Sequence, residues 1–246
     1  MTVAYDGTPF HGFATNPDVR TVQDDLEAAL ATVLRRPTPI ACAGRTDRGV
    51  HARGQVVSFD AAADHFEPHA LTRALNRMLA PSIAVRDVVA TADDFDARFS
   101  CVARSYRYRV LNTATPDPLV HHLVWHVREP LDVDAMQLAC DRILGQHDFS
   151  TFSKRNKSKA AETFVRTVQH AQWAHRGPNV QLDIRANAFT HQMVRSLVGM
   201  FVEIGRGRRQ AVEMGEALRA LDRTAAPSPA PPQGLVLLKA HYHDPT

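Results

Sequence analysis

The order of helix-like and strand-like stretches constrains the fold of this 246-residue chain more than any other feature. In some stretches apolar residues recur at helical spacing, and in others they alternate with polar residues. The two patterns do not follow one another in the regular strand–helix–strand order of a parallel sheet. The order therefore predicts an α+β fold in which helices pack on a mostly antiparallel sheet.

Local signals set the expected ends of the elements. Thr21 is expected to cap the first helix, with Asp24 in a capping-box position, and Pro68 marks the entry to the second. The expected helices span about 22–34, 68–80, 132–145 and 193–205, with one more ending near 221. The expected strands span 2–5, 40–43, 55–59, 83–85, 104–110, a stretch from 166, 180–184 and 234–237. Phe95 and Phe99 are expected in the core, and Leu144 on the buried side of its helix.

A polar, glycine-rich stretch from Gly44 to Gly54 lies between two of the expected strands. In an extended segment Arg45 and Asp47 point to the same side, and an arginine beside a carboxylate keeps it ionised. This setting suits an anionic nucleophile or an anion site. The alternative is a polar loop in which Asp47 bonds its own backbone as an Asx turn, and local chemistry alone favours that turn.

The string GRTDRGVHARGQVVSFD, residues 44–60, resembles the signature loop of the tRNA pseudouridine synthase A (TruA) family, GRTDxGVHAxxQVxxF. Further motifs of that family are matched in family order, at 5–13, 94–100 (DFxARFS), 147–152 (HDFxxF), 189–195 (FxHxMVR) and 234–237 (GLxL). The chain departs from the family at Phe10, Phe13 and Ala14, where Tyr, Trp and Gln are usual. The resemblance implies an isomerase that converts uridine to pseudouridine in tRNA.

The resemblance also implies roles for particular residues. Asp47 is the expected nucleophile, attacking either the ribose C1′ or the uracil C6, and the sequence does not choose between them. Arg195 pairs with that aspartate, and Tyr106 stacks on the target uracil and is a candidate base. Arg45 contacts RNA or fills the gap left by the flipped base. Leu235 is expected to wall the site, and Arg48 and His51 are further candidates for substrate contact.

At the level of architecture, the resemblance implies two ferredoxin-like halves, 1–100 and 101–246, that share one sheet and have the active-site cleft between them. The first half contains the Asp47 loop, and the second contains the tyrosine strand, a basic loop and the Arg195 helix. The implied targets are uridines 38 to 40 of the anticodon stem-loop. A homodimer is implied as well, with tRNA crossing both subunits.

Strand 104–110 alternates strictly, so that Tyr106 and Tyr108 face one way and Arg107 and Arg109 the other. Aromatic residues beside arginines suit base stacking, but strand aromatics usually pack in the sheet. Packing is the interpretation adopted for Tyr108. For Tyr106, the resemblance favours stacking on the target uracil.

Two basic clusters are candidates for phosphate contact. The first is the loop 154–159, in which Lys154, Arg155 and Lys157 are named as candidates. The second follows the fourth helix, and Arg208 is its candidate. The alternative for such charge runs is a solvated segment.

Composition limits the remaining possibilities. The net charge of +3 is too small to predict nucleic-acid binding by itself. The three cysteines form no CxxC pair, which fits a reducing cytosol, and no signal peptide or membrane-spanning run is found. The 13 histidines are scattered without metal-ligand spacing, so no cofactor or metal is expected. A cytoplasmic protein with tRNA as its partner is predicted; the alternative is a non-catalytic tRNA-binding or tRNA-folding protein.

Overall fold

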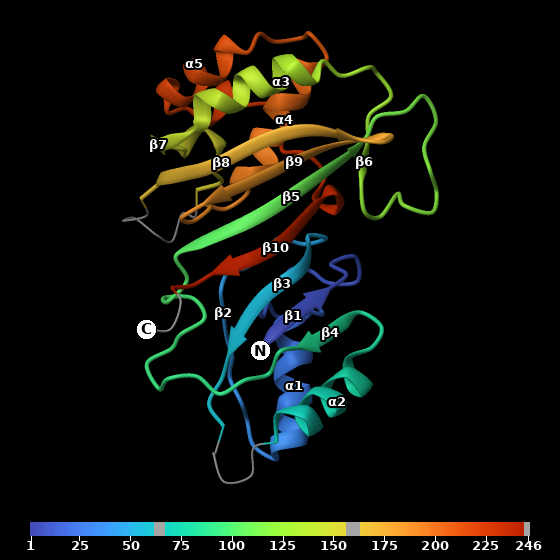
Figure 1. Ribbon diagram of the computed structural model, residues 1–246, viewed down its shortest axis with the longest axis vertical. Coiled ribbons are helices and arrows are strands. Elements are labelled where there is room, and N and C mark those ends of the chain that lie inside the picture. The colour runs from blue at the N-terminus through green and yellow to red at the C-terminus, as the bar shows by residue number, and fades with distance from the viewer. Residues whose placement is uncertain (62–66, 156–162, 244–246) are drawn as a thin grey trace. The chain divides into compact units, whose positions relative to one another are not determined.

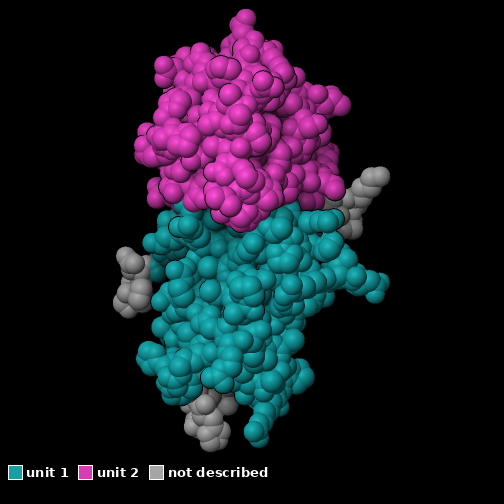
Figure 2. Space-filling model, turned by 90° about the vertical axis from the view of Figure 1, so that its right-hand side faces the viewer, with its two compact units in different colours: residues 1–102, 236–246 teal, residues 103–235 magenta. Residues whose placement is uncertain are grey.

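The computed structural model describes residues 1–61, 67–155 and 163–243. The chain forms two compact units, shown in different colours in Figure 2. Unit 1 contains Met1–Val102 and Val236–Thr246, and unit 2 contains Ala103–Leu235. Among the described residues, no helix is both long enough and apolar enough to span a membrane.

Unit 1 contains a mixed sheet and two helices (Figure 1). Its elements are β1 (Thr2–Tyr5), α1 (Val22–Leu34), β2 (Ala41–Cys42), β3 (His51–Ser58), α2 (Pro68–Leu79), β4 (Ile83–Arg86) and β10 (Leu235–His241), the last beginning one residue before the unit does. The strand order is β4-β1-β3-β10, with β2 paired to β3. The pairs of β1 with β3 and with β4 and of β2 with β3 are antiparallel, whereas β10 runs parallel to β3.

The helices of unit 1 begin where the sequence predicts. The Thr21 hydroxyl accepts a hydrogen bond from the Asp24 N–H and caps α1. Pro68 is the first residue of α2, and Glu67 caps it by accepting two backbone N–H bonds. Both helices bury leucines at helical spacing and pack against each other.

Unit 2 contains mostly antiparallel strands with three helices beside them (Figure 1). Its elements are β5 (Ala103–Leu111), β6 (Trp125–His126), α3 (Val133–Cys140), β7 (Gly145–Asp148), β8 (Val165–Arg176), β9 (Asn179–Ala186), α4 (Met193–Gly205) and α5 (Val212–Ala220). Strands β5, β9, β8 and β7 are antiparallel neighbours in that order, and β6 pairs parallel to β5. In both units the prediction of an α+β fold with a mostly antiparallel sheet is confirmed.

Helix α4 is the core of unit 2. The residues of its predicted apolar stripe (Met193, Leu197, Met200, Phe201 and Ile204) are all buried. Val194, Val198 and Val202 on its other faces are buried too; α3 packs against the helix, and Trp173 of β8 meets its Phe201 edge-on. At Gly205 a Cβ atom would lie only 2.6 Å from the Met136 sulfur of α3, so glycine permits this close helix packing.

Four sequence-based expectations are wrong. Phe99 is 81% exposed, because the Asp96 carboxylate accepts the N–H groups of Arg98 and Phe99 and so turns Ala97 inward instead. The third helix ends at Cys140 and continues only as a short 3₁₀ turn to residue 143, since Gly145 adopts a φ of +87° and starts β7. Leu144 consequently leaves the helical stripe and is 41% exposed.

The fourth error concerns strand β3, which begins at His51 and not at residue 55. Its early residues pair with β10 and with β1, and these partners extend the strand into the polar stretch. Phe95, the other phenylalanine expected in the core, is half-buried against the ring of Tyr242, with 5.1 Å between centroids.

Candidate active site

The Asp47 loop spans residues 44–50, between β2 and β3. The Val50 N–H donates to the Asp47 carbonyl at 3.1 Å, and Gly49 has a φ of +77°. A positive φ at the third position is typical of a type II turn, which requires glycine there. The main-chain carbonyl of Asp47 closes this turn, so the turn does not depend on the carboxylate. Asp47 is half-buried, and Arg45 and Arg48 on either side of it are exposed.

Hydrogen bonds to buried polar groups fix the loop at Gly44 and Thr46. The Tyr5 hydroxyl lies 2.8 Å from the Thr46 hydroxyl, and the Phe13 N–H donates to the Thr46 carbonyl at 3.0 Å. Gln55, which is fully buried, accepts from the Gly44 N–H at 3.3 Å and donates to the Gly44 carbonyl at 2.6 Å. Residues on both sides of Arg45 are therefore fixed, and Asp47 follows directly after a residue held through backbone and side chain.

Burial raises the pKa of Tyr5, so this phenol stays neutral and can serve as a hydrogen-bond partner. No sequence-based prediction assigned a role to Tyr5, Thr46 or Gln55. A signal was present, because a glutamine next to the apolar pair Val56-Val57 in an expected strand must find partners once it is buried.

His51, the first residue of β3, directly follows the loop and is 4% exposed. Its Nδ1 is 3.0 Å from the Gly7 nitrogen and 3.1 Å from an oxygen of Asp6. A ring nitrogen that accepts the Gly7 N–H cannot at the same time donate to Asp6, so the two contacts belong to different protonation states. Gly7 itself touches the loop: a Cβ there would lie 2.2 Å from the Val50 carbonyl oxygen. Substrate contact by His51 stays a prediction.

In unit 2, β5 presents both tyrosines to the same buried side, as its alternation predicts. Tyr106 is 8% exposed and meets the ring of Phe189 edge-on, with centroids 5.1 Å apart. Tyr108 is completely buried, and its hydroxyl donates to the Pro231 carbonyl at 2.7 Å. On the opposite side, Arg107 pairs with Asp183 of β9 at 2.7 Å.

Arg195 lies in the first turn of α4 and is half-buried. Its Nε donates to the Ala230 carbonyl at 2.8 Å, so the segment that follows α5 fixes part of its side chain. Burial raises the pKa of Tyr108, and the positive charge of Arg195 acts in the opposite direction. Leu235, the first residue of β10, is 5% exposed.

The basic loop begins beside the entry to α4. The Lys154 N–H donates to the His191 carbonyl at 2.9 Å, and the side chains of Lys154 and Arg155 are exposed. The Arg155 guanidinium lies 5.4 Å from the centre of the Phe164 ring. Lys157 falls outside the described residues.

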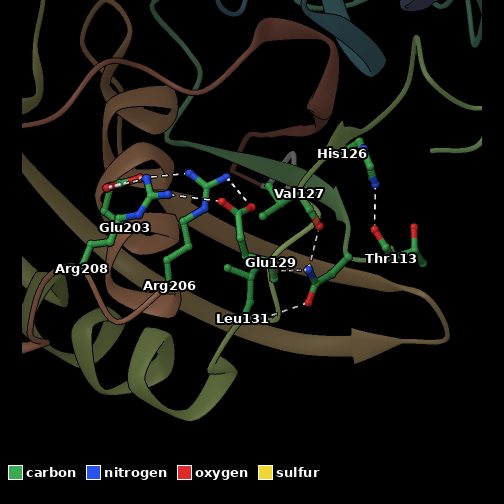
Figure 3. A network of polar contacts seen from close by, with 9 residues as sticks. Thr113, His126, Val127, Glu129, Leu131, Glu203, Arg206 and Arg208 are labelled. Atoms are coloured by element: carbon green, nitrogen blue, oxygen red, sulfur yellow. Dashed lines mark hydrogen bonds and ion pairs between the residues drawn. The ribbon is translucent and has the colours of Figure 1, made fainter. Parts of the chain in front are cut away.

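The second basic cluster is already paired with carboxylates (Figure 3). Arg206 contacts Glu129 and Glu203 at 3.1 Å, and Arg208 contacts the same two glutamates at 3.2 and 3.3 Å. Asn112 holds the segment around Glu129 through bonds to the carbonyls of residues 127 and 129. Glu203 is close in the sequence, three residues before Arg206, whereas Glu129 comes from the β6–α3 connection and is distant in the chain, so the sequence did not indicate this second partner.

The structure thus groups the predicted residues in two sets. Asp47, Arg45 and Arg48 share the loop of unit 1, His51 follows it in β3, and the remaining described candidates belong to unit 2. Within the part of the chain that the structure describes, no three His, Cys, Asp or Glu side chains are placed to hold a metal ion.

Comparison with known proteins decides the family. A family model described as tRNA pseudouridine synthase matches residues 1–100 and 139–243. The chain belongs to the tRNA pseudouridine synthase family. Proteins named tRNA pseudouridine synthase A from Escherichia fergusonii, Escherichia coli (strain SMS-3-5 / SECEC) and Shigella boydii serotype 18 are each 41% identical to it over 244 residues. These matches cover 99% of this chain and 89% of each relative.

The family membership expected from the 44–60 string is therefore confirmed. Among solved structures, a chain of a Cbf5-Nop10-Gar1 complex superposes on this tRNA pseudouridine synthase family member with a TM-score of 0.38 and 13% sequence identity. The superposition covers 98% of this chain and 59% of that one. Similarity at this level supports no structural argument.

Proposed function

We propose that this protein converts uridine to pseudouridine in tRNA, with Asp47 as the nucleophile. The observation that supports this most directly is the way the family's loop is built here. A half-buried carboxylate stands on a tight turn that Tyr5, Phe13 and Gln55 fix from below. A fixed nucleophile favours catalysis because its orientation is set before the substrate arrives.

The proposed reaction exchanges one bond of the base for another. Asp47 attacks the ribose C1′ or the uracil C6, the C1′–N1 bond breaks, the uracil rotates, C5 bonds to C1′, and the bond to Asp47 breaks. C5 loses its hydrogen as a proton and the freed N1 gains a proton, so substrate and product are isomers. Arg195 keeps Asp47 ionised through an ion pair, and Tyr106 stacks on the uracil and is the candidate base. No cofactor or metal takes part.

The proposed site lies in a cleft between two ferredoxin-like halves, 1–100 and 101–246, that share one sheet. Because a stacked base must be extruded to react, Arg45 is proposed to fill the gap it leaves, with Leu235 as a wall of the pocket. Arg48 and His51 are proposed near the substrate, and the phosphate contacts are assigned to Lys154, Arg155, Lys157 and Arg208. The proposed targets are uridines 38 to 40 of the anticodon stem-loop, bound in the cytoplasm by a homodimer.

Tritium release from tRNA labelled as [5-³H]uridine tests the reaction and the nucleophile together. Wild-type protein is expected to release tritium without added metal, and Asp47→Asn to release none. Asp18→Asn is the matched control, because Asp18 is exposed, has a φ of +62° and tolerates asparagine in that conformation. Release by Asp47→Asn would refute the nucleophile. If wild type binds tRNA without releasing tritium, the protein is a non-catalytic tRNA-binding or tRNA-folding protein.

The salt dependence of tRNA affinity tests the phosphate contacts. Replacing Lys154 and Arg155 with glutamine is expected to reduce the slope of log K against log salt by about 1 for each phosphate that is no longer neutralised. Arg208→Gln is expected to change the slope less, because Glu129 and Glu203 already offset its charge. An unchanged slope in the 154/155 variant would show that this loop lies away from the RNA.

A further inference from the structure

The proline-rich segment 226–232 is in backbone contact with α4, at the turn that contains Arg195. The Ala230 N–H donates to the Arg195 carbonyl at 2.9 Å, and the Arg195 Nε donates to the Ala230 carbonyl at 2.8 Å. One helical turn further, a Cβ on Gly199 would lie 2.4 Å from the Ser228 carbonyl oxygen. Residues four apart lie on the same face of a helix, so the segment follows that face from residue 195 to residue 199.

The next peptide of the segment is held by a second group. The Tyr108 hydroxyl donates to the Pro231 carbonyl at 2.7 Å, and the tyrosine is fully buried. Gly234 leaves room for its ring, since a Cβ there would lie 2.6 Å from the ring carbon that bears the hydroxyl. Two consecutive carbonyls therefore accept from different donors: the Ala230 carbonyl accepts from Arg195, and the Pro231 carbonyl accepts from Tyr108.

We propose that Tyr108 and the segment 226–232 position the guanidinium of Arg195 for the reaction. The bond from Nε fixes the plane of the guanidinium and hence the directions in which Nη1 and Nη2 donate. Prolines restrict φ in the segment, so the carbonyl that accepts from Nε has little freedom to move. Tyr108 is a positioning residue that acts through the Pro231 and Ala230 peptides.

This inference rests on the proposed function, in which Arg195 pairs with the nucleophile. It assigns a role to Tyr108, for which the sequence predicted only packing, and to the proline-rich segment 226–232. A guanidinium that loses its orientation keeps its charge, so the reaction rate is expected to fall while tRNA affinity stays constant.

Tyr108→Phe isolates the hydroxyl, because it keeps the ring and its packing. Single-turnover tritium release at saturating protein is expected to slow roughly tenfold, less than the 10²-fold that a displacement of about 1 Å can cost. The tRNA dissociation constant is expected to stay within about twofold of wild type. Tyr242→Phe is the matched control, since the Tyr242 hydroxyl also donates to a backbone carbonyl, that of Ala97, at 2.7 Å. It is expected to leave the rate unchanged.

A double-mutant cycle separates positioning from a general structural role. Arg195→Lys keeps the positive charge but loses the planar group that the segment orients. If Tyr108 acts through Arg195, Tyr108→Phe slows the Arg195→Lys protein by less than about twofold. An equal slowing in both backgrounds, or a full rate in Tyr108→Phe alone, would overturn the inference and leave the proposed function intact.

The remaining outcomes are also decisive. Absence of tritium release by wild type would remove the proposed function, and the inference with it. If Tyr108→Phe does not fold, Pro231→Gly takes its place, because it keeps the carbonyl and frees the segment. The same loss of rate, again absent in the Arg195→Lys background, is then expected, and a full rate would overturn the inference.

Discussion

Gly7→Ala is expected to disable the Asp47 loop from a position that bears no functional group. A Cβ on residue 7 would lie 2.2 Å from the Val50 carbonyl oxygen and 2.9 Å from the Gly49 carbonyl carbon. Both atoms belong to the turn that begins at Asp47. The φ of Gly7 lies outside the left-handed region, so alanine could adopt the backbone conformation and the clash alone opposes it.

The size of the effect follows from this overlap. Relief of the clash requires the turn to retreat by about 1 Å, and a displacement of about 1 Å in a catalytic group can cost on the order of 10²-fold in rate. Overpacking of this kind costs about 1–3 kcal/mol of stability. A chain of this length loses about 2–4 °C of melting temperature per kcal/mol, so the variant should remain folded at 25 °C.

The assay is single-turnover tritium release, with thermal unfolding measured on the same samples. Gly145→Ala is the matched control: its Cβ would meet nothing within 4 Å, but its φ of +87° makes alanine strained. The control should lose a similar amount of stability, about 1–2 kcal/mol, and keep its rate. A normal rate in Gly7→Ala, or an equal loss of rate in both variants, would refute the argument that the backbone of residue 7 sets the position of Asp47.

Other perturbations test the packing around the site. Phe99→Ser should change stability by less than about 0.5 kcal/mol, whereas Phe149→Ala should cost about 3–5 kcal/mol, as measured by urea unfolding, because Phe149 is fully buried. Tyr5→Phe should cost about 1–3 kcal/mol, since it leaves the Thr46 hydroxyl without this buried partner, and the double variant with Thr46→Val should lose less than the sum of the single losses. Burial raises the pKa of the Cys140 thiol, so its contribution to stability is complete below the ordinary thiol pKa of about 8.5 and decreases as the pH rises above it. Cys140→Ala should therefore flatten the first part of the alkaline loss of stability, and an unchanged pH profile would contradict this.

Much of the secondary structure could be predicted from the sequence, because its signals are local. The Thr21 cap, the entry at Pro68 and the alternation of β5 depend on residues within a few positions of each other, and all three predictions hold. The predictions fail where a partner that is distant in the sequence determines where an element begins or ends. β3 begins at His51 because β10, almost two hundred residues later, pairs with it there.

Phe99 shows a second limit of sequence-based prediction. Its aromatic side chain predicts a core position, but the Asp96 carboxylate sets the turn and places Ala97, two residues earlier, inside. The Ala97 N–H bonds the Ser58 hydroxyl, and its carbonyl accepts from Tyr242, so distant elements complete that choice. Hydrophobicity alone does not predict which of two nearby apolar residues such a turn will bury.

In the candidate site too, local sequence motifs identify some residues, whereas other contacts form only when the chain folds. The motif identifies Asp47 and Arg195 as chemical groups, but it does not contain the contacts that orient them. Tyr5 and Gln55 hold the first loop, and Ala230, 35 positions after Arg195, holds the second residue. The proposed ion pair requires both groups to be oriented, because a bidentate carboxylate–guanidinium arrangement is planar and directional. The residues that orient each group within its own unit have small or neutral side chains, so a search of the sequence for charged or nucleophilic groups passes over them, although a substitution at any of them should alter the rate.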